Sequence, residues 1–420
     1  GLENSLTFTY DSLGRMLTQT DANGNTTEFT YSPAGNLIKV KDAEEGETLY
    51  TYNGAGQVLT VTDPLGNTVS YEYDALGHVT TVTDPMGGKI SLTYTADGQI
   101  ATVTDPEGSV TEYAYDACGN LIQTVNPLGV TTLYEYDAMN NRIKECLSAS
   151  GEQTCITLYQ YDKKGRRIKE INPALEEKVY TYDGNGNLSS MTDEDTNKTT
   201  VSYDLNNKPV HMAYSDGKEA SFRYNKRGEL VEISDWNGIT SMEHDEVGRL
   251  TKVTDPDSRT VCYSYDGAGN ITGITYPDGS VVNYAYDKNN RMTEAADKDG
   301  KAVWYTYDGA GRVGSRCQPD STVSYAYNAK GLPVQITHRL ADTDFLKETL
   351  SYDKAGAGRM TGLERVGENL AIAGSMSYAY DGAGQLVSYR RGQNTETYGY
   401  DLLGNRTFRK TNGADGAVYQ

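Results

Sequence analysis

The sequence predicts an all-β protein, a long antiparallel strip of about nineteen β-hairpin repeats, and three observations lead to this prediction. Tyrosine is unusually frequent, with 34 copies against 5 phenylalanines and 2 tryptophans. Gly, Thr, Asn and Asp are also frequent, and these residues favour turns or strands over long helices. A tyrosine also recurs about every 21 residues along the chain.

Each repeat is anchored on a tyrosine that ends its first strand. The anchors fall at Tyr10, Tyr31, Tyr52, Tyr73, Tyr94, Tyr115, Tyr136, Tyr161, Tyr182, Tyr203, Tyr224, His244, Tyr265, Tyr286, Tyr307, Tyr327, Tyr352, Tyr380 and Tyr400. Three insertions interrupt the even spacing. The repeats cover residues 1–420 without room for a separate globular domain, so we expect one continuous array. Because the next anchor falls due directly after Gln420, we expect a fragment of a longer array.

The stretch YEYDALGH, residues 71–78, shows the first half of a repeat. Tyr71 and Tyr73 are two residues apart in a strand, so their side chains point to the same face of the sheet. The position of Tyr71 holds an aromatic residue in most repeats and a large apolar residue in the others. We therefore interpret these two rings as structural, and expect ladders of such rings along the strip.

Asp74 and Gly77 belong to the turn that follows the anchor. Other repeats replace the aspartate by Asn, Ser or Thr, all of which carry a side-chain oxygen that accepts a hydrogen bond from the turn backbone. An acid-base role would not survive these replacements. The glycine is replaced only by asparagine, at Asn140, Asn207 and Asn290, which indicates a left-handed backbone.

A second turn follows a short strand and completes the unit. It reads TDPLGN at residues 62–67 and TDPMGG at residues 83–88, with proline at the first corner and glycine at the second. Each repeat is therefore predicted to be one hairpin. The apolar residues of the short strand differ in parity between repeats, which a β-bulge in some units would reconcile.

Catalysis is not expected from this chain. The histidines His78, His211, His244 and His338 fall at unrelated repeat positions, and no GxSxG, HExxH or P-loop motif accompanies them. The position of His78 holds Arg, Asn or Gln elsewhere. We expect neither catalytic residues nor a cofactor.

One weak metal candidate is the segment DGNGNLSSMTDE, residues 183–194. Asp183, Asn185, Asn187 and Glu194 have oxygen ligands at a spacing that resembles a calcium loop. Against a metal, the sixth position is Leu188 where such loops need glycine, and the repeat makes the segment part of a hairpin.

The insertion between Tyr136 and Tyr161 lengthens one hairpin, and Cys146 and Cys155 flank it. We expect the two cysteines to face each other and form a disulfide, which would fit an extracellular setting. Cys118, Cys262 and Cys317 lie in different repeats.

The formal net charge of −20 argues against binding to nucleic acid or to an anionic membrane. A basic cluster near the C-terminus is interpreted as solvated strand faces; it contains Arg390, Arg391, Arg406, Arg409 and Lys410. We find no apolar run of membrane-spanning length and no signal peptide.

The length of the strip predicts that it curls. About 38 strands at ~4.8 Å spacing make a strip roughly 180 Å long. Flat open sheets of this size are unstable in water, because strands twist and long edges aggregate. Bent into one turn, the strip would form a girdle of roughly 55–60 Å diameter.

The repeated turns YDSLGR from Tyr10, YDACGN from Tyr115 and YDLLGN from Tyr400 resemble those of the YD-repeat, or RHS-repeat, family. This family includes bacterial RHS polymorphic toxins, wall-associated proteins, the C component of insecticidal toxin complexes and teneurins. The resemblance implies a β-strip coiled into part of a hollow shell, in a secreted or cell-surface protein of bacterial origin.

The resemblance also implies a partner, namely a C-terminal toxin or effector domain outside this chain, or neighbouring shell segments of the same polypeptide. The DPxG core segment and self-cleavage site of the bacterial shells have no match here, so we assign no protease role to the DPLG of residues 63–66. The alternative is an extracellular adhesion scaffold that binds a cell-surface protein or glycan through its tyrosine-rich sheet.

Overall fold

The computed structural model describes residues 5–149, 152–341, 343–353, 358–367 and 373–418, and these residues form one antiparallel sheet of 39 strands. The odd-numbered strands up to β37 each end at an anchor: β1 (Thr7–Tyr10), β3 (Thr26–Tyr31), β5 (Glu47–Tyr52), β7 (Thr68–Tyr73), β9 (Lys89–Tyr94), β11 (Val110–Tyr115), β13 (Thr131–Tyr136), β15 (Glu152–Tyr161), β17 (Glu177–Tyr182), β19 (Lys198–Tyr203), β21 (Glu219–Tyr224), β23 (Gly238–His244), β25 (Thr260–Tyr265), β27 (Val281–Tyr286), β29 (Ala302–Tyr307), β31 (Ser321–Tyr327), β33 (Thr343–Tyr352), β35 (Gly374–Tyr380), β37 (Asn394–Tyr400), with β39 (Ala414–Val418) last.

The even-numbered strands follow the YD turns: β2 (Met16–Thr20), β4 (Leu37–Lys41), β6 (Val58–Thr62), β8 (Val79–Thr83), β10 (Ile100–Thr104), β12 (Leu121–Val125), β14 (Arg142–Ala149), β16 (Arg167–Ile171), β18 (Leu188–Thr192), β20 (Pro209–Tyr214), β22 (Leu230–Asp235), β24 (Leu250–Thr254), β26 (Ile271–Thr275), β28 (Met292–Asp297), β30 (Val313–Gln318), β32 (Pro333–Leu340), β34 (Met360–Gly367), β36 (Leu386–Arg391), β38 (Arg406–Thr411). Each strand pairs with the one before and the one after it, so the all-β prediction of a hairpin array is confirmed.

A β-bulge lies next to every YD turn, with its extra residue on the strand that follows the turn. Between β7 and β8, Glu72 lies opposite Thr81 but Tyr73 lies opposite Val79, so Thr80 is an extra residue. The same register shift occurs at the anchor of every repeat, for example at Tyr10 and at Tyr400. The sequence predicted a bulge in some units; the structure has one in all of them.

Both turns of a repeat share one backbone geometry. In the YD turn, the carbonyl of Asp74 accepts the N–H of Gly77 at 3.1 Å, and the Asp74 N–H donates to the carbonyl of His78 at 3.0 Å. The carboxylate Oδ1 of Asp74 accepts the N–H groups of Leu76 and His78, each at 2.9 Å. Gly77 has φ of 94°. Asp63 and Gly66 make the same two backbone bonds in the DPxG turn.

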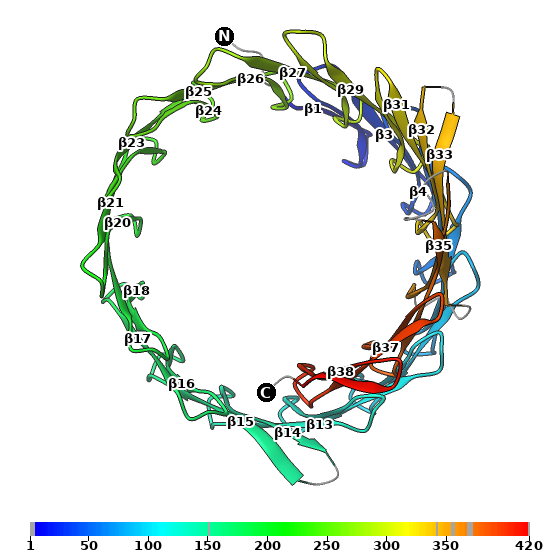
Figure 1. The fold of residues 1–420 in the computed structure, drawn as a ribbon, viewed down its shortest axis with the longest axis vertical. Helices are drawn as coiled ribbons and strands as arrows, with labels where there is room; N and C mark the ends of the chain where they lie inside the picture. The colour runs from blue at the N-terminus through cyan, green and yellow to red at the C-terminus, as the bar shows by residue number, and fades with distance from the viewer. Residues whose placement is uncertain (1–4, 150–151, 342, 354–357, 368–372, 419–420) are drawn as a thin grey trace.

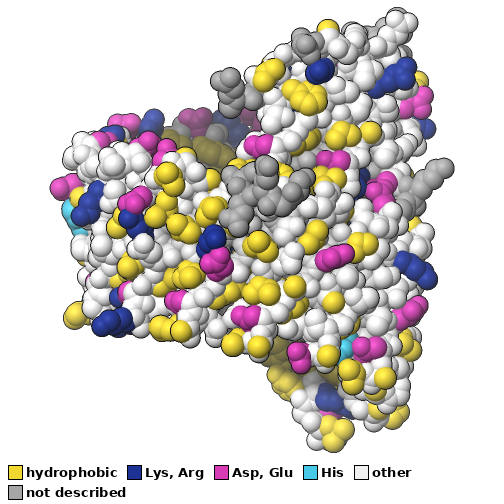
Figure 2. Space-filling model, turned by 90° about the horizontal axis from the view of Figure 1, so that it is seen from below, with side chains coloured by type: hydrophobic (Ala, Val, Ile, Leu, Met, Phe, Trp, Pro, Cys, Tyr) yellow, Lys and Arg dark blue, Asp and Glu magenta, His cyan; other side chains and the backbone are white. Residues whose placement is uncertain are grey.

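The strip coils into a ring and then overlaps itself (Figure 1). The strands from β27 onward form a second coil that lies along the first part of the chain. Figure 2 shows the result from the side: the wall is low on one side of the ring and tall where the coils overlap. The strip therefore makes more than the single turn for which the sequence estimate of the diameter was made.

The contacts between the coils show how many strands make one full turn of the coil. Asn23 in the β2–β3 turn contacts Asp266 in the β25–β26 turn, 243 residues later. About 23 strands therefore complete a turn, which gives a wall of roughly 110 Å and a diameter of roughly 35–45 Å once strand tilt is allowed for. This ring is narrower than the sequence estimate because a turn uses fewer strands.

The described residues form almost no central core. Among described residues, the buried apolar side chains are Cys146, Ala220, Ala302 and Met376. Each repeat instead half-buries its rings against the next repeat, so stability is a sum of neighbour contacts. No described segment forms a helix that is long and apolar enough to span a membrane.

Candidate functional site: the joints of the coil

In most repeats the anchor tyrosine ties the repeat to the one before it. Tyr73 Oη donates a hydrogen bond to the backbone carbonyl of Val58 at 2.7 Å, and Tyr94 donates to the carbonyl of Val79 at 2.6 Å. The accepting residue is the first of the bulged strand in the preceding repeat. The same bond is made by Tyr52, Tyr136, Tyr161, Tyr182, Tyr203, Tyr224, Tyr265, Tyr286, Tyr307, Tyr327, Tyr352, Tyr380 and Tyr400.

This hydroxyl was missed by sequence reasoning, although a signal exists. Phenylalanine occurs two residues before the anchor, at Phe8, Phe29 and Phe222, but never at the anchor itself. A position that accepts tyrosine and excludes phenylalanine selects the hydroxyl and not the ring alone. His244 is the exception, and its buried Nδ1 has no hydrogen-bond partner among the described residues.

In many of the described repeats, the residue five positions after the anchor forms the second part of the joint. His78 Nδ1 lies 3.0 Å from Asp74 Oδ2, and the imidazole stacks on the ring of Tyr94 with centroids 4.6 Å apart. Hydrogen bonds with the side chain and backbone of His78 hold the pKa of Asp74 below its usual range. The arginines at the same position pair with their own turn aspartate and lie over the next anchor ring; they are Arg15, Arg166, Arg249, Arg291 and Arg312.

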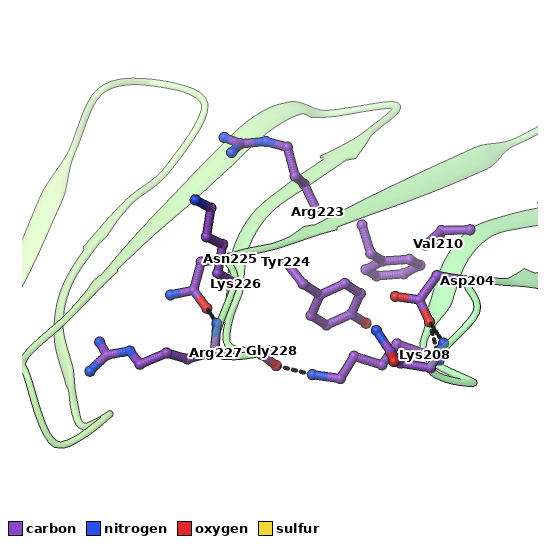
Figure 3. Close-up of a pocket in the computed structure, with 11 residues that line it drawn as sticks. Asp204, Lys208, Val210, Arg223, Tyr224, Asn225, Lys226, Arg227 and Gly228 are labelled. Atoms are coloured by element: carbon purple, nitrogen blue, oxygen red, sulfur yellow. Dashed lines mark hydrogen bonds between the residues drawn. The ribbon is translucent and has the colours of Figure 1, made fainter.

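A hollow in the wall, of about 550 Å³, is another such joint (Figure 3). Lys208 donates its backbone N–H to Asp204 Oδ1 at 3.0 Å and its ammonium group to the carbonyl of Gly228. The Lys208 ammonium also lies 5.0 Å from the centroid of the Tyr224 ring. In Figure 3 the side chains of Arg223 and Arg227 extend away from Tyr224. The hollow thus lacks converging groups of the kind that bind or transform a small substrate.

The structure places the residues of the weak metal candidate apart. Asp183 and Asn187 lie in a YD turn, where Asn187 Nδ2 donates to Asp183 Oδ2 at 2.9 Å, and Asn185 donates to Asn207 of the next turn. Glu194 lies beyond strand β18, at the opposite edge of the sheet, and pairs with Lys178 at 2.7 Å. Glu194 therefore does not converge with the other three residues, because strand β18 separates it from their turn. Among described residues no cluster of His, Cys, Asp or Glu could hold a metal.

The expected disulfide between Cys146 and Cys155 is absent, and both thiols are free. The register of the lengthened β14–β15 hairpin explains this result. Cys146 lies opposite Ile156, and Cys155 lies opposite Leu147. Since neighbouring residues of a strand point to opposite faces, the two cysteines are on different sides of the sheet.

The histidines lie apart from one another in paired or buried positions. His211 Nε2 lies 3.4 Å from Glu219, and His338 Nε2 lies 3.3 Å from Glu348. Glu348 also accepts a hydrogen bond from Arg365 at 2.7 Å. The carboxylates of Glu219 and Glu348 therefore pair with neighbouring side chains of the sheet.

The second kind of joint is the seam between the coils, where DPxG turns of the first coil meet YD turns of the second. Asn23 Nδ2 donates to Asp266 Oδ2 at 3.0 Å, and the N–H of Ala43 donates to Asn289 Oδ1 at 3.1 Å. The backbones approach closely: a Cβ on Gly267 would lie 2.9 Å from the carbonyl oxygen of Ala22.

Ion pairs continue the seam. Lys330 lies 2.8 Å from Asp84, and Arg359 lies 2.9 Å from Glu107 and 3.4 Å from Asp105. Burial acts to raise the pKa of Asp84, but hydrogen bonds from Lys330 and from the turn backbone hold it below its usual range. Each contact links residues that are far apart in the sequence, so the seam closes the wall between successive coils.

A family model of the teneurin YD-shell matches residues 2–175 and 210–361, which is most of the chain. The chain belongs to the teneurin YD-shell family. A model of the RHS repeat also matches this YD-shell chain, at residues 182–220. Family and fold together suggest a structural role, and the resemblance predicted from the YD turns is confirmed. A search of curated proteins found no match.

Solved structures of toxin complexes resemble the YD-shell chain in fold. The complex TcdB2-TccC3-Cdc42 matches with a TM-score of 0.56 and 14% identity, over 94% of this chain and 26% of the other. The Tc holotoxin pore of Photorhabdus luminescens matches with a TM-score of 0.55 and 14% identity, over 97% of this chain and 26% of the other. The YD-shell chain thus spans about a quarter of the length of these relatives.

Proposed function

We propose that this YD-shell chain is a non-catalytic wall segment of a hollow shell in a secreted or cell-surface bacterial protein. The shell encloses or presents a C-terminal toxin or effector domain, together with neighbouring shell segments of the same polypeptide. The observation that carries the proposal is the coil itself, a wall one strand layer thick that returns on itself and is joined at a seam (Figure 1).

The size of the ring supports enclosure. A folded domain of 100 residues has a radius of gyration of about 13 Å, which is of the same order as a ring roughly 35–45 Å across. The wall is continuous along the strip, because tyrosine hydroxyls link neighbouring repeats. It is also continuous from coil to coil, because ion pairs such as Lys330–Asp84 cross the seam.

Protease protection tests the proposal. The full polypeptide that contains this array should be expressed with its downstream sequence and digested under native conditions. We expect the downstream domain to be cleaved at least about tenfold more slowly than the same domain expressed alone, because the wall excludes the protease. Equal rates of cleavage would contradict enclosure.

The alternative of an adhesion scaffold has less support from the geometry. A sugar or protein ligand needs aromatic rings that are open to contact. Anchor rings are instead covered by a side chain of the preceding repeat, as Tyr94 is covered by His78 and Tyr265 by Arg249. A glycan-array screen that found a bound sugar would favour the alternative.

A further inference from the structure

The contacts at the seam repeat with a single offset. The β25–β26 turn lies on the β2–β3 turn, so each YD turn of the second coil lies on the DPxG turn 23 strands earlier. Five further pairs of turns keep this offset, from the β4–β5 turn with the β27–β28 turn to the β12–β13 turn with the β35–β36 turn. The register between the coils is therefore constant along the described seam.

Many of these contacts are made by the tip of the DPxG turn, which is the residue before its closing position. The amide of Asn23 donates to a carboxylate of the YD turn that it meets. Glu44 Oε1 accepts the backbone N–H of Lys288 at 2.8 Å, and Glu107 lies 2.9 Å from Arg359. An amide tip thus meets an acceptor, and an acidic tip meets a donor.

The two leucine tips meet glycine. Leu65 lies against Gly309, where a Cβ added to the glycine would be 3.1 Å from Leu65 Cδ2. Leu128 lies against Gly382, where an added Cβ would be 3.6 Å from Leu128 Cδ2 and 3.4 Å from Cβ of Pro127. Each leucine therefore packs on a YD turn that has no side chain at its second position.

The turn itself does not require these two glycines. The backbone is not left-handed at Gly309 or at Gly382, and other YD turns hold Leu205 or Lys226 at the same second position. A large side chain is therefore compatible with the turn. The close approach of the neighbouring coil is what requires glycine here.

A shift of the second coil by one repeat would remove the fit of both leucines. In one direction Leu65 would meet Ala329, and Leu128 would meet Leu402 at the position of the glycine. In the other direction Leu65 would meet Lys288. The two leucine tips are six strands apart, and so are the two glycine turns that they meet. The native register is therefore the one of these three in which both tips meet glycine.

Charge favours the same register. The first of these shifts would also move Glu107 from Arg359 to the turn that begins at Asp381, and residues 381–385 contain no cation. A carboxylate placed between the coils without a cation or another donor is unfavourable. Packing and electrostatics therefore act together against a slipped seam.

We propose that the DPxG tips and the YD turns that they meet form a matched set that fixes the register of the coil. The register in turn sets the number of strands per turn and the diameter of the ring. One tip specifies only a class of turn, since leucine fits glycine and glutamate fits a donor. The order of the tips along the seam specifies one register. This matching concerns the geometry of the wall and is independent of any enclosed domain.

Zero-length cross-linking of the purified chain reports the register. A carbodiimide joins a carboxylate to an ammonium group that touches it, and takes up the water that amide formation releases. The native register therefore gives an amide between Asp84 and Lys330, which lie 2.8 Å apart. A seam shifted by one repeat brings Lys330 to the turn of Asp63 or of Asp105, and gives different cross-linked peptides in the mass spectrum.

The decisive variant combines Gly309→Leu with Gly382→Leu. The yield of the Asp84–Lys330 cross-link falls by about fivefold or more, because both leucine tips are overpacked in the native register. Adding Leu65→Ala and Leu128→Ala restores most of the yield, since the space is returned at both joints. An unchanged yield in the variant with two substitutions overturns the proposal.

The single substitutions supply the matched control. Leu65→Ala rescues Gly309→Leu but not Gly382→Leu, and Leu128→Ala rescues only Gly382→Leu. Hydrogen exchange in the turns at residues 63–66 and 126–129 follows the two joints separately, and circular dichroism follows the sheet. Rescue that ignores this pairing overturns the proposal. So does a Gly309→Leu chain that loses its sheet and does not recover it with Leu65→Ala, because the turn itself would then reject leucine.

Discussion

At the scale of single residues, the anchor position joins repeats through a hydroxyl as well as a ring. Tyr73 illustrates the arrangement, because its ring packs in the sheet and its Oη reaches the carbonyl of Val58 in the previous repeat. A half-buried carbonyl that loses its donor loses a hydrogen bond that the ring alone cannot replace, which explains the preference for tyrosine over phenylalanine.

Tyr73→Phe is therefore expected to destabilise the array by about 1 kcal/mol, because the ring is kept and one hydrogen bond is lost. The shift of the urea unfolding midpoint, read by circular dichroism, measures the effect. Tyr71→Phe is the control, since the Tyr71 hydroxyl has no hydrogen bond within the described part of the chain. Equal effects of the two substitutions would refute the role of the anchor hydroxyl.

The turn aspartates predict a dependence of stability on pH. Hydrogen bonds lower the folded-state pKa of Asp74, Asp116 and Asp137 below the unfolded value near 3.9. A group with a lowered folded pKa contributes stability above its unfolded pKa and loses it as the pH falls. Stability should thus be flat near neutral pH and fall below about pH 4, as chemical denaturation at several pH values will show.

At the scale of one element, the hairpin depends on two turns with left-handed closing residues. Gly77 closes the YD turn at φ of 94°, and Asn140 fills the same role at φ of 61°. The bulge next to the turn places the anchor Oη near the preceding repeat. Turn, bulge and anchor are therefore one structural unit that recurs along the chain.

Gly77→Ala is expected to cost about 1–2 kcal/mol, because a Cβ disfavours the left-handed backbone. Gly77→Asn should cost less, as asparagine already occupies equivalent turns. Gly54→Ala is a matched control within a YD turn, because its backbone is not left-handed and a Cβ there meets no atom within 4 Å. Thermal unfolding should rank the three variants in that order, and a Gly54 variant as unstable as Gly77→Ala would argue against this account.

At the scale of the whole molecule, the coil is held by contacts between residues more than 240 positions apart. Arg359 reaches Glu107 and Asp105 across the seam, 252 and 254 residues away. Such pairs are partly exposed and individually weak, so the seam depends on their number and on close backbone approach. The overlap of the coils also explains why the wall is tall on one side (Figure 2).

Arg359→Glu should open the seam locally, because it places like charges opposite each other. Hydrogen exchange in the turn at residues 105–108 should rise while exchange in the β18–β19 turn, far from the seam, stays unchanged. Adding Glu107→Arg should restore part of the protection, since Glu107 does not form the turn bonds that Asp105 makes. Uniformly increased exchange would indicate unfolding and not seam opening.

Much of the fold was predictable from sequence, because an internal repeat acts as its own mutation series. In other repeats asparagine replaces both Gly77 and Asp74. These replacements indicated a turn from residue chemistry alone. The failures share a cause. The Cys146–Cys155 disulfide and the Asp183–Glu194 metal candidate both assumed proximity along the chain, whereas strand parity and the length of β18 set the side chains apart.

Local pattern thus determined the class of fold, the hairpin unit and the turn roles, because these depend on interactions within about 21 residues. The curvature of the strip was beyond that pattern, since it accumulates from small twists over many strands. The number of strands in a turn, and with it the pairing of Lys330 with Asp84, emerged from the closed coil. The seam joins repeats that are far apart in the chain. The sequence of one repeat does not indicate which distant repeat it will contact.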